Sequence, residues 1–326
     1  MSFADIPGQE RAKTILQNGL RRDRLSHAYI FCGPVGTGRG RMAKTFAQAL
    51  FCRETVGDAC GHCPECRKVE HGNHPNVHWI EPDGMSIKID QIRELQQRLA
   101  YRSAASAVNV YVVREADKMT VQAANSLLKF LEEPLSPTVA VLIAENGHSL
   151  IPTIRSRAQW VPFVPMAPRA MAETLFAEGH PRELVLPAVH LASGIDAARQ
   201  LIQADWFAET RNVMIQLMKD SLSKMPFLSG VQQHVMRTEA SDHIDTLVDL
   251  AALWFKDLIL VSVGKKERIV YIDQADWLAR HAFNRSAGLW VRCVEAAVEA
   301  RKRLRFHANP QLTLERFLYS VQQSID

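Results

Sequence analysis

Short apolar runs alternate with helical apolar stripes through the first half of the chain. The runs predict buried strands at residues 27–32, 77–80, 108–113, 139–143 and 160–163. Between two of them, Ala124, Leu127 and Leu131 recur at spacings of three and four, which is typical of an amphipathic helix. Strands that alternate with helices in this way predict an α/β fold with a doubly wound parallel sheet.

Polar residues and prolines set the expected limits of the helices. A first helix is predicted over residues 9–21. Asp90 and Thr120 are the expected N-caps of two later helices, because their side-chain oxygens can accept a free backbone N–H. The apolar stripe of the first of these reaches Leu99, and Pro134 is expected to end the second.

The strand signal largely disappears after Pro168. Apolar stripes, one of them beginning at Ile244, then predict helices that bury one face in a core or against a partner. Cys293 lies in another stripe and is expected to be an inert packing residue. The predicted division is an α/β domain over residues 1–165, a small helical domain over 166–205 and a larger helical domain over 206–326.

Composition limits the class of protein. With 326 residues, 47% of them hydrophobic, the chain can bury proper cores. A formal charge of +4 is compatible with nucleic acid nearby without requiring it. The first residues do not read as a secretion signal, and the longest apolar stretch, 247–263, contains Asp249, Lys256 and Asp257. We therefore expect a cytoplasmic protein with no membrane partner.

A glycine-rich stretch between the first strand and the next helix has the outline of a phosphate-binding loop. Gly33, Gly36 and Gly38 match the backbone part of the pattern G-x-x-x-x-G-K-[ST], whose N–H groups cradle phosphates. Arg39 stands where the pattern has a lysine, and Gly40 where it has the hydroxyl that holds magnesium. Any nucleotide binding by this degenerate loop is doubtful on these residues.

The end of the third predicted strand departs from the hydrolase pattern as well. A nucleotide hydrolase has an Asp-Glu pair there, with the Asp on the magnesium side and the Glu orienting water. This chain has Arg114 and Glu115. Because a cation opposes metal binding, two independent parts of the ATP machinery are missing together.

Four cysteines follow the helix after the glycine loop, and they predict a structural Zn²⁺ site. The expected ligands are Cys52, Cys60, Cys63 and Cys66. A histidine at position 62, 71 or 74 is the alternative to Cys52, which we prefer because it makes four soft ligands of one kind. In a chain without an export signal, such a cluster favours metal binding over disulfides, and a closed site gives no metal catalysis.

Several motifs together resemble those of bacterial clamp-loader subunits. They are the glycine loop, the four-cysteine insertion, Asn125-Ser-Leu-Leu-Lys-Phe-Leu-Glu-Glu-Pro134, Arg155-Ser-Arg157 and Asn309-Pro-Gln-Leu-Thr-Leu-Glu-Arg-Phe-Leu318. The resemblance spans nearly the whole chain. It implies an AAA+ domain with a zinc module at 52–66, a small helical lid and an all-α collar through which five subunits form a ring.

Within that family, the ATPase subunits keep the lysine, the hydroxyl and the Asp-Glu pair. This sequence lacks them, and it has Ala197 and Ala198 near the place of a lid arginine. The resemblance therefore implies a non-hydrolysing, stator-like subunit that does not bind ATP productively. Its implied partners are the ATPase (gamma/tau) and delta subunits, and, through the complex, the sliding clamp and primed DNA.

The resemblance also gives Arg157, with its neighbour Ser156, a role as an arginine finger that reaches ATP on the adjacent subunit. The family's Ser-Arg-Cys reads Ser156-Arg157-Ala158 here. Without the resemblance, an ordinary ion pair near a domain edge would be the preferred interpretation of Arg157.

Two other hypotheses remain at this point. The chain could be a divergent ATPase in which Arg39 and Glu115 suffice. It could instead be a zinc-ribbon nucleic-acid binding protein, although only Arg67, Lys68 and His71 lie near the cysteines where basic and aromatic residues would be needed.

Overall fold

The computed structural model describes residues 1–102, 108–132, 137–222 and 231–325 of the chain. The chain divides into two compact units, Met1–Met166 and Ala167–Asp326. The division into three domains stays a prediction.

The first unit is built on a five-stranded parallel sheet with the strand order β2-β3-β4-β1-β5. Its strands are β1 (Ala28–Cys32), β2 (Val77–Ile80), β3 (Asn109–Val113), β4 (Thr138–Ala144) and β5 (Gln159–Pro162). All five predicted strands are present, and the dense β-branched strand β3 lies inside the sheet. A parallel sheet needs crossover connections, which here are helices.

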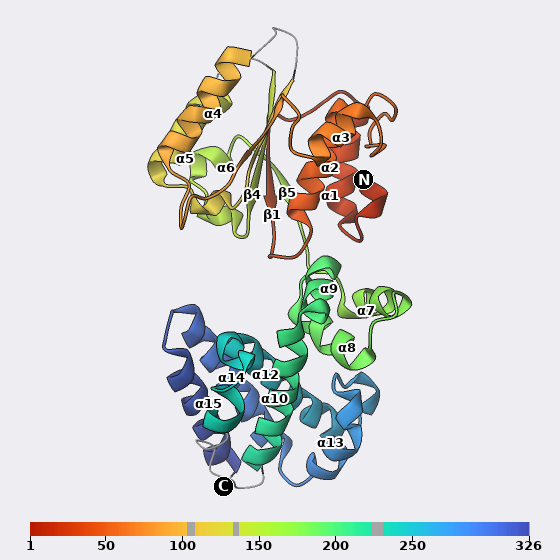
Figure 1. Ribbon diagram of the computed structural model, residues 1–326, viewed down its shortest axis with the longest axis vertical. Helices are drawn as coiled ribbons and strands as arrows, with labels where there is room; N and C mark the ends of the chain where they lie inside the picture. The colour runs from red at the N-terminus through yellow and green to blue at the C-terminus, as the bar shows by residue number, and fades with distance from the viewer. Residues whose placement is uncertain (103–107, 133–136, 223–230, 326) are drawn as a thin grey trace. The chain divides into compact units, whose positions relative to one another are not determined.

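Helices cover both faces of this sheet, as Figure 1 shows. One face carries α1 (Glu10–Arg21), α2 (Arg39–Phe51) and α3 (Pro64–Glu70), and the other carries α4 (Ile89–Arg102), α5 (Val121–Glu132) and α6 (Pro152–Arg155). Short 3₁₀ turns lie at Phe3–Asp5, Ala116–Lys118 and Gly147–Ser149. The predicted α/β class with a doubly wound parallel sheet is confirmed.

Strand β3 shows why the core has two halves. Val110 and Val112 pack on the α1–α3 side, whereas Tyr111 and Val113 pack on the α4–α6 side. All four are buried, because side chains alternate across the pleat and both faces are covered. A strand of this kind therefore reads as a continuous apolar run and not as an alternation.

The two predicted helix caps have different outcomes. Thr120 caps α5, since its Oγ1 accepts the Ala123 N–H at 3.2 Å. The prediction for Asp90 was wrong, because α4 already begins at Ile89. There the side chain of Gln91 accepts the Lys88 N–H at 3.0 Å and so starts the helix before Asp90. The predicted helix end at Pro134 and the side chain of Leu99 lie outside the described residues.

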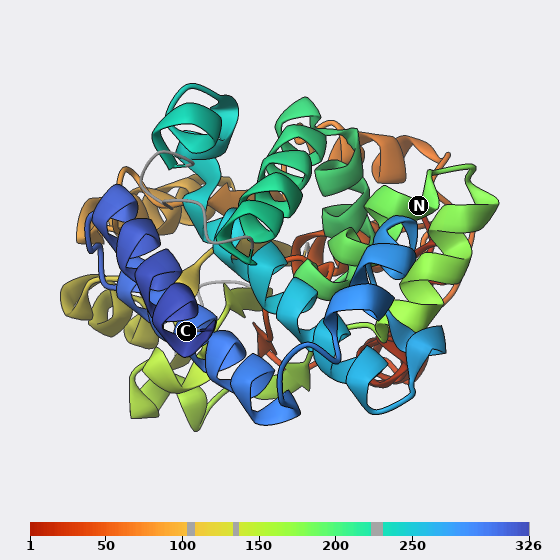
Figure 2. The same ribbon diagram turned by 90° about the horizontal axis from the view of Figure 1, so that it is seen from below.

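The second unit is helical throughout its described part. Its α-helices are α7 (Pro168–Ala177), α8 (Arg182–Leu191), α9 (Ile195–Gln203), α10 (Asp205–Leu222), α12 (Ile244–Ser262), α13 (Ala275–His281), α14 (Ala287–Arg305) and α15 (Pro310–Ile325). Short helical turns lie at Val231–Val235, Glu239–His243, Lys266–Arg268 and Ile272–Gln274. Helices α12, α14 and α15 lie against one another, and Figure 2 gives a second view of them.

The core of this unit includes Trp254 on α12 and Trp290 on α14, both almost fully buried. Cys293 packs among these helices, and burial raises the pKa of its thiol to about 12, as expected for an inert residue. Val298, farther along the same helix, is exposed. It lies one residue beyond the buried Ala297, and a step of one residue turns a side chain by about 100° around the helix.

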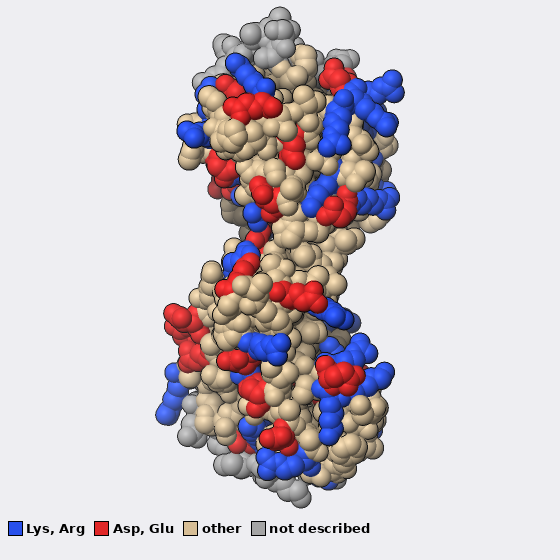
Figure 3. Space-filling view, turned by 90° about the vertical axis from the view of Figure 1, so that its right-hand side faces the viewer, with Lys and Arg blue, Asp and Glu red and all other residues tan. Residues whose placement is uncertain are grey.

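Within the described residues, no helix combines the length and apolar character that a membrane crossing requires. On the face drawn in Figure 3, basic and acidic side chains are interspersed on each unit. This distribution agrees with the small formal charge of +4.

Candidate functional site

The glycine loop joins the carboxyl end of β1 to the start of α2. Gly36 and Gly38 have φ angles of +87° and +83°, which side chains with a Cβ rarely adopt. Gly33 is required for a different reason, because a Cβ there would lie 2.2 Å from the carbonyl oxygen of Phe163. Thr37 closes the turn by donating its hydroxyl to Pro34 O at 2.8 Å. Two glycines with positive φ, the close contact at Gly33 and the Thr37 hydrogen bond therefore fix the shape of this turn.

Arg39, at the lysine position, is the first residue of α2 and is partly buried. Burial lowers the pKa of its guanidinium, and the carboxylates of Asp117 and Glu145 oppose this shift. The charge of Arg39 is thus partly balanced by acids of its own chain. A phosphate would have to compete with them, which weakens the loop as an anion site.

Arg114 follows β3 and lies beside Gly40. A Cβ on Gly40 would stand 3.4 Å from Arg114 Nη2. The guanidinium is held by Glu81, whose Oε1 accepts from Nη1 at 2.7 Å, and it lies over the ring of Trp79 at 5.4 Å from the centroid. The structure thus brings together two departures from the hydrolase pattern, at positions 40 and 114. A cation occupies the side of the loop where the missing hydroxyl would hold magnesium.

Glu115, at the position of the Glu in the hydrolase pair, forms an ion pair within its own chain. Its backbone has a φ of +48°, and its half-exposed carboxylate pairs with Lys118 in the following turn. The carboxylate is therefore engaged by a cation of its own chain.

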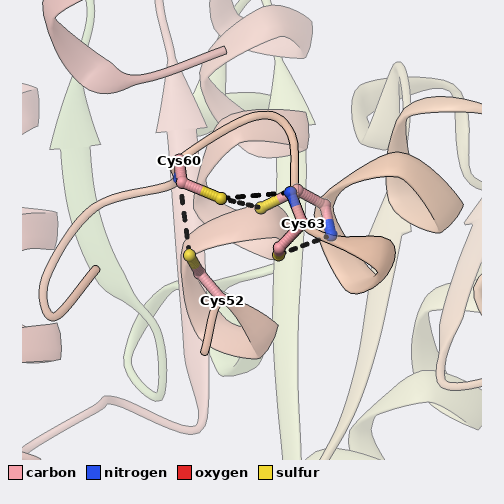
Figure 4. A group of neighbouring side chains, drawn as sticks. Cys52, Cys60 and Cys63 are labelled. Carbon is pink, nitrogen blue, oxygen red and sulfur yellow. Dashed lines mark hydrogen bonds between the residues drawn. The ribbon is translucent and has the colours of Figure 1, made fainter. Parts of the chain in front are cut away.

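The four predicted cysteine ligands come together in the fold. Their Sγ atoms all lie within 4.8 Å of one another. Figure 4 shows Cys52, Cys60 and Cys63 turned toward a common centre. The Cys60 and Cys66 sulfurs are 3.9 Å apart, and a tetrahedral zinc with Zn–S bonds of about 2.3 Å needs a separation of about 3.8 Å. The cluster could therefore hold a metal ion of this size.

Backbone N–H groups around the cluster suit thiolate ligands. Cys60 N–H donates to Cys52 Sγ at 3.4 Å, Cys63 N–H to Cys60 Sγ at 3.3 Å and Cys66 N–H to Cys63 Sγ at 3.4 Å. Burial acts to raise the pKa of the Cys52 thiol, but N–H groups of Cys60, Glu54 and Thr55 outweigh it and lower the pKa to about 6. The thiolate is the form that binds metal.

Of the histidines considered as alternative ligands, two pair with glutamates and one lies at the end of a helix. His62 Nδ1 lies 3.1 Å from Glu54 in an exposed pair, and the buried His74 pairs with Glu65 at 3.2 Å. His71 is exposed at the C-cap of α3. The geometry favours Cys52 as the fourth ligand, although His62 also lies near Cys60 and Glu54.

Gln48 connects the cysteine module to the helix that follows the glycine loop. Its Nε2 donates to Cys66 O and to Glu70 Oε2, each at 3.0 Å. The side chain is fully buried between α2 and α3. The sequence analysis missed Gln48, which a polar position within the apolar face of α2 could have signalled. The module is thus fixed to the sheet domain and is not a separate appendage.

Ser156 and Arg157 lie in the turn between α6 and β5. Ile154, in α6, is fully buried and fixes this turn to the core. Ser156 Oγ donates to Thr153 O at 3.1 Å. Arg157 keeps 40% of its side chain exposed. Ala158, at the family's cysteine position, is buried and begins the return into the sheet.

Strand register separates Arg157 from the glycine loop of its own chain. Strands β1 and β5 are parallel, with Tyr29 opposite Gln159 and Cys32 opposite Pro162. Arg157 therefore precedes the amino end of β5, whereas the glycine loop follows the carboxyl end of β1. The two features lie at opposite ends of the strands.

The arginine nearest to the expected lid position is also engaged. Arg199 Nη2 and Nε donate to the Glu178 carboxylate at 2.7 and 3.0 Å, and Nη1 donates to Asp196 at 2.7 Å. Ala198, beside it on α9, is buried. Arg199 thus has a structural role within the second unit.

Two acids were not singled out from the sequence: Glu81, which pairs with Arg114, and Glu132, which pairs with Arg157. Glu81 directly follows β2, as Arg114 follows the neighbouring strand β3, so the pairing of these strands could have placed them together. Glu132 ends α5 and lies 2.7 Å from Arg157. Nothing in the local sequence signals that contact.

Comparisons with known proteins agree on one group. A family model described as "DNA polymerase III, delta subunit" matches residues 8–167. DNA polymerase III subunit delta' of Bacillus subtilis (strain 168) is 33% identical over 317 residues, which are 97% of this chain and 96% of that protein. Subunit tau of the same strain is 36% identical over 159 residues, 48% of this chain and 28% of that protein.

Among solved structures, a DNA polymerase III gamma subunit-related protein of Thermotoga maritima aligns over 97% of this chain and all of its own chain. Its sequence identity is 18% and its TM-score 0.45.

Proposed function

This chain belongs to the DNA polymerase III delta-prime subunit family, and we propose that it acts in the clamp loader as a subunit that does not hydrolyse ATP. In this role it assembles with the ATPase (gamma/tau) and delta subunits into a five-membered ring that loads the sliding clamp on primed DNA. The collar for this assembly would be formed by residues 206–326, and the lid by residues 166–205.

The observation that carries this proposal is the position of Arg114 beside Gly40. A magnesium ion with its phosphates needs a hydroxyl and a carboxylate there. The chain instead offers a glycine and a guanidinium that is fixed by Glu81 and Trp79. Charge repulsion and the missing ligands therefore oppose productive binding of magnesium and ATP.

The cysteine module fits a structural zinc. Cys52, Cys60, Cys63 and Cys66 would hold the ion with no open position, so it would supply folding free energy and no catalysis. A zinc-ribbon function in nucleic-acid binding is less favoured, because Lys68, one of the few cations nearby, already pairs with Glu65 at 3.1 Å.

Arg157 would serve the ATP site of a neighbouring subunit. It lies at the opposite end of the strands from its own loop, in a turn that the core holds in place. Charge builds on the transferred phosphoryl group in the transition state, and an arginine supplied in trans accelerates such reactions by roughly 10³–10⁵. The divergent-ATPase alternative would require Arg39 and Glu115 to act in place of the missing groups.

The loop is tested on the isolated chain. Titration calorimetry with Mg-ATP is expected to show weak or no binding, and a phosphate-release assay no turnover. Micromolar magnesium-dependent binding with turnover would refute the non-hydrolysing role and support the divergent ATPase.

The finger is tested in the assembled complex with Arg157→Ala. The variant is expected to fold and to assemble, but to lower DNA-stimulated ATP hydrolysis and clamp loading. The loss of total ATPase should be partial, because the other sites keep their own arginines. If both activities are unchanged at full incorporation, Arg157 has no role in hydrolysis.

A further inference from the structure

The guanidinium of Arg157 is held on two sides by its own unit. Nη2 lies 2.7 Å from Glu132 Oε1 at the end of α5. Nη1 donates to Thr153 O at 3.2 Å and to Ser156 Oγ at 3.3 Å. These contacts engage both terminal nitrogens of a side chain that is otherwise 40% exposed. Arg169, by comparison, pairs with Glu173 one turn along its own helix, whereas Arg157 is held from two separate elements.

Both elements are anchored in the core by buried residues next to the points of contact. Glu132 directly follows the buried Leu131, and Leu127, one turn earlier, is fully buried. Thr153 precedes the fully buried Ile154 in α6. The backbone that carries each acceptor is therefore anchored in the core, whereas the exposed side chains of Arg157 and Glu132 keep rotamer freedom of their own.

A carboxylate beside Arg157 could either orient its guanidinium toward the nucleotide of a neighbouring subunit or hold the guanidinium away from that nucleotide. The Glu132 side chain is 47% exposed, and ion pairs between exposed groups are weak in water. Such a pair cannot compete with the several negative charges of a nucleotide triphosphate. It can still select among the many rotamers of an arginine, since a planar fork that makes two ordered contacts loses little further freedom when it binds. Because the ion pair is exposed, Glu132 is better suited to orient the guanidinium of Arg157 than to hold it away from a nucleotide.

We propose that Glu132 is a positioning residue for the trans-acting Arg157. It would fix the direction of the guanidinium before the neighbouring subunit's nucleotide arrives, and leave the remaining N–H groups for the phosphates. This inference rests on the proposed role of Arg157.

The test uses the complete clamp-loader complex with wild-type chain, Glu132→Ala, Glu132→Gln, Arg157→Ala and the double variant Glu132→Ala with Arg157→Ala. Steady-state ATPase with primed DNA and clamp gives kcat and KM for each. Glu173→Ala is the control, because it removes the exposed partner of Arg169 at a place far along the chain. Thermal unfolding and gel filtration confirm equal folding and incorporation.

Glu132→Ala is expected to lower kcat of the finger-dependent hydrolysis about two- to fivefold, the factor that corresponds to the coupling of an exposed ion pair, with KM little changed. Glu132→Gln, which keeps an oxygen acceptor, should recover part of the loss. In the Arg157→Ala background, Glu132→Ala should have no further effect. A purely structural role would reduce activity in both backgrounds and would overturn the inference.

The remaining outcomes separate the two proposals. If Arg157→Ala lowers hydrolysis and Glu132→Ala does not, the positioning role is wrong and the finger remains. If Glu132→Ala raises hydrolysis, the carboxylate withholds the arginine and the positioning role is likewise wrong. If Arg157→Ala itself has no effect, both the finger and the inference fail.

Discussion

Asp257 gives a quantitative test of the second unit, because it is a fully buried carboxylate that is held by backbone N–H groups. Its Oδ2 accepts the N–H groups of Val270 and Tyr271, each at 2.8 Å. Its Oδ1 has no hydrogen-bond partner within the part of the chain that the structure describes. Burial raises the pKa of this carboxyl from 3.8 to about 6, against the opposing effect of the two N–H groups.

The sign of the pH dependence follows from proton binding. Between pH 3.8 and about 6, the folded chain holds the Asp257 proton more tightly than the unfolded chain does. The contribution of this group to the unfolding free energy therefore falls as pH rises through that window. A shift of about two pKa units corresponds to roughly 3 kcal/mol, which is lost by about pH 7.

The perturbation is Asp257→Asn, whose side-chain oxygen can accept the same two N–H groups but does not titrate. Urea unfolding, followed by the fluorescence of tryptophans such as Trp254, gives the unfolding free energy at pH 4.5, 5.5, 6.5 and 7.5. Because part of the effect is already lost at pH 4.5, the difference between wild type and variant is expected to shift by about 2 kcal/mol in favour of the variant from pH 4.5 to 7.5. Taking the difference removes the titration of all other groups.

A second substitution and a control complete this test. Asp257→Ala leaves two buried N–H groups without acceptors and should destabilise at every pH, by about 1–3 kcal/mol for each group. Asp242→Asn changes an exposed carboxylate in the same unit and should leave the pH dependence as it is. If the difference between wild type and Asp257→Asn is constant from pH 4.5 to 7.5, the reasoning from burial is wrong.

The metal module, the glycine loop and a helix cap each give a simpler test. Elemental analysis should find one zinc per chain, and Cys60→Ser should lower both metal content and melting temperature; unchanged values would exclude the four-thiolate site. Gly33→Ala forces a Cβ onto the Phe163 carbonyl and should lower the unfolding free energy in urea by more than about 2 kcal/mol. Gly72→Ala, with open space and a φ of +73°, should lower it by about 1–2 kcal/mol. Equal losses would contradict the steric argument. Thr120→Ala should cost about 1 kcal/mol by the same measurement, and no loss would mean that its hydroxyl contributes nothing to the helix.

The sheet could be predicted from sequence because each strand is a local signal. Runs such as Asn109–Val113 are apolar and β-branched, and burial on both faces makes them continuous. The cysteine cluster could also be predicted from the sequence, since Cys60, Cys63 and Cys66 lie within one short segment. The prediction for Asp90 failed because it is not the only polar residue near the start of the helix. The side chain of Gln91 accepts the Lys88 N–H, and the helix begins at Ile89, before Asp90.

Contacts between distant segments could not be predicted in the same way. Arg114 meets Gly40 only because the sheet order places the ends of β3 and β1 near one another with β4 between them. Arg157 meets Glu132 across two elements whose relative position depends on the packed core. In the sequence, nothing distinguishes Asp257 from the other charged residues of α12, and only the structure shows that the loop at Val270 closes over it.

The opposite placement of the glycine loop and Arg157 along the strands makes the proposed contact directional. In a head-to-tail arrangement, one side of this chain would give an arginine, and the other would offer a loop that lacks a lysine, a hydroxyl and a metal carboxylate. A ring made of this chain alone would therefore contain only mismatched junctions, each with a donor and no competent acceptor. Under the proposed role, the chain gains activity only beside a different subunit, and homo-oligomers would be inert however well they assembled.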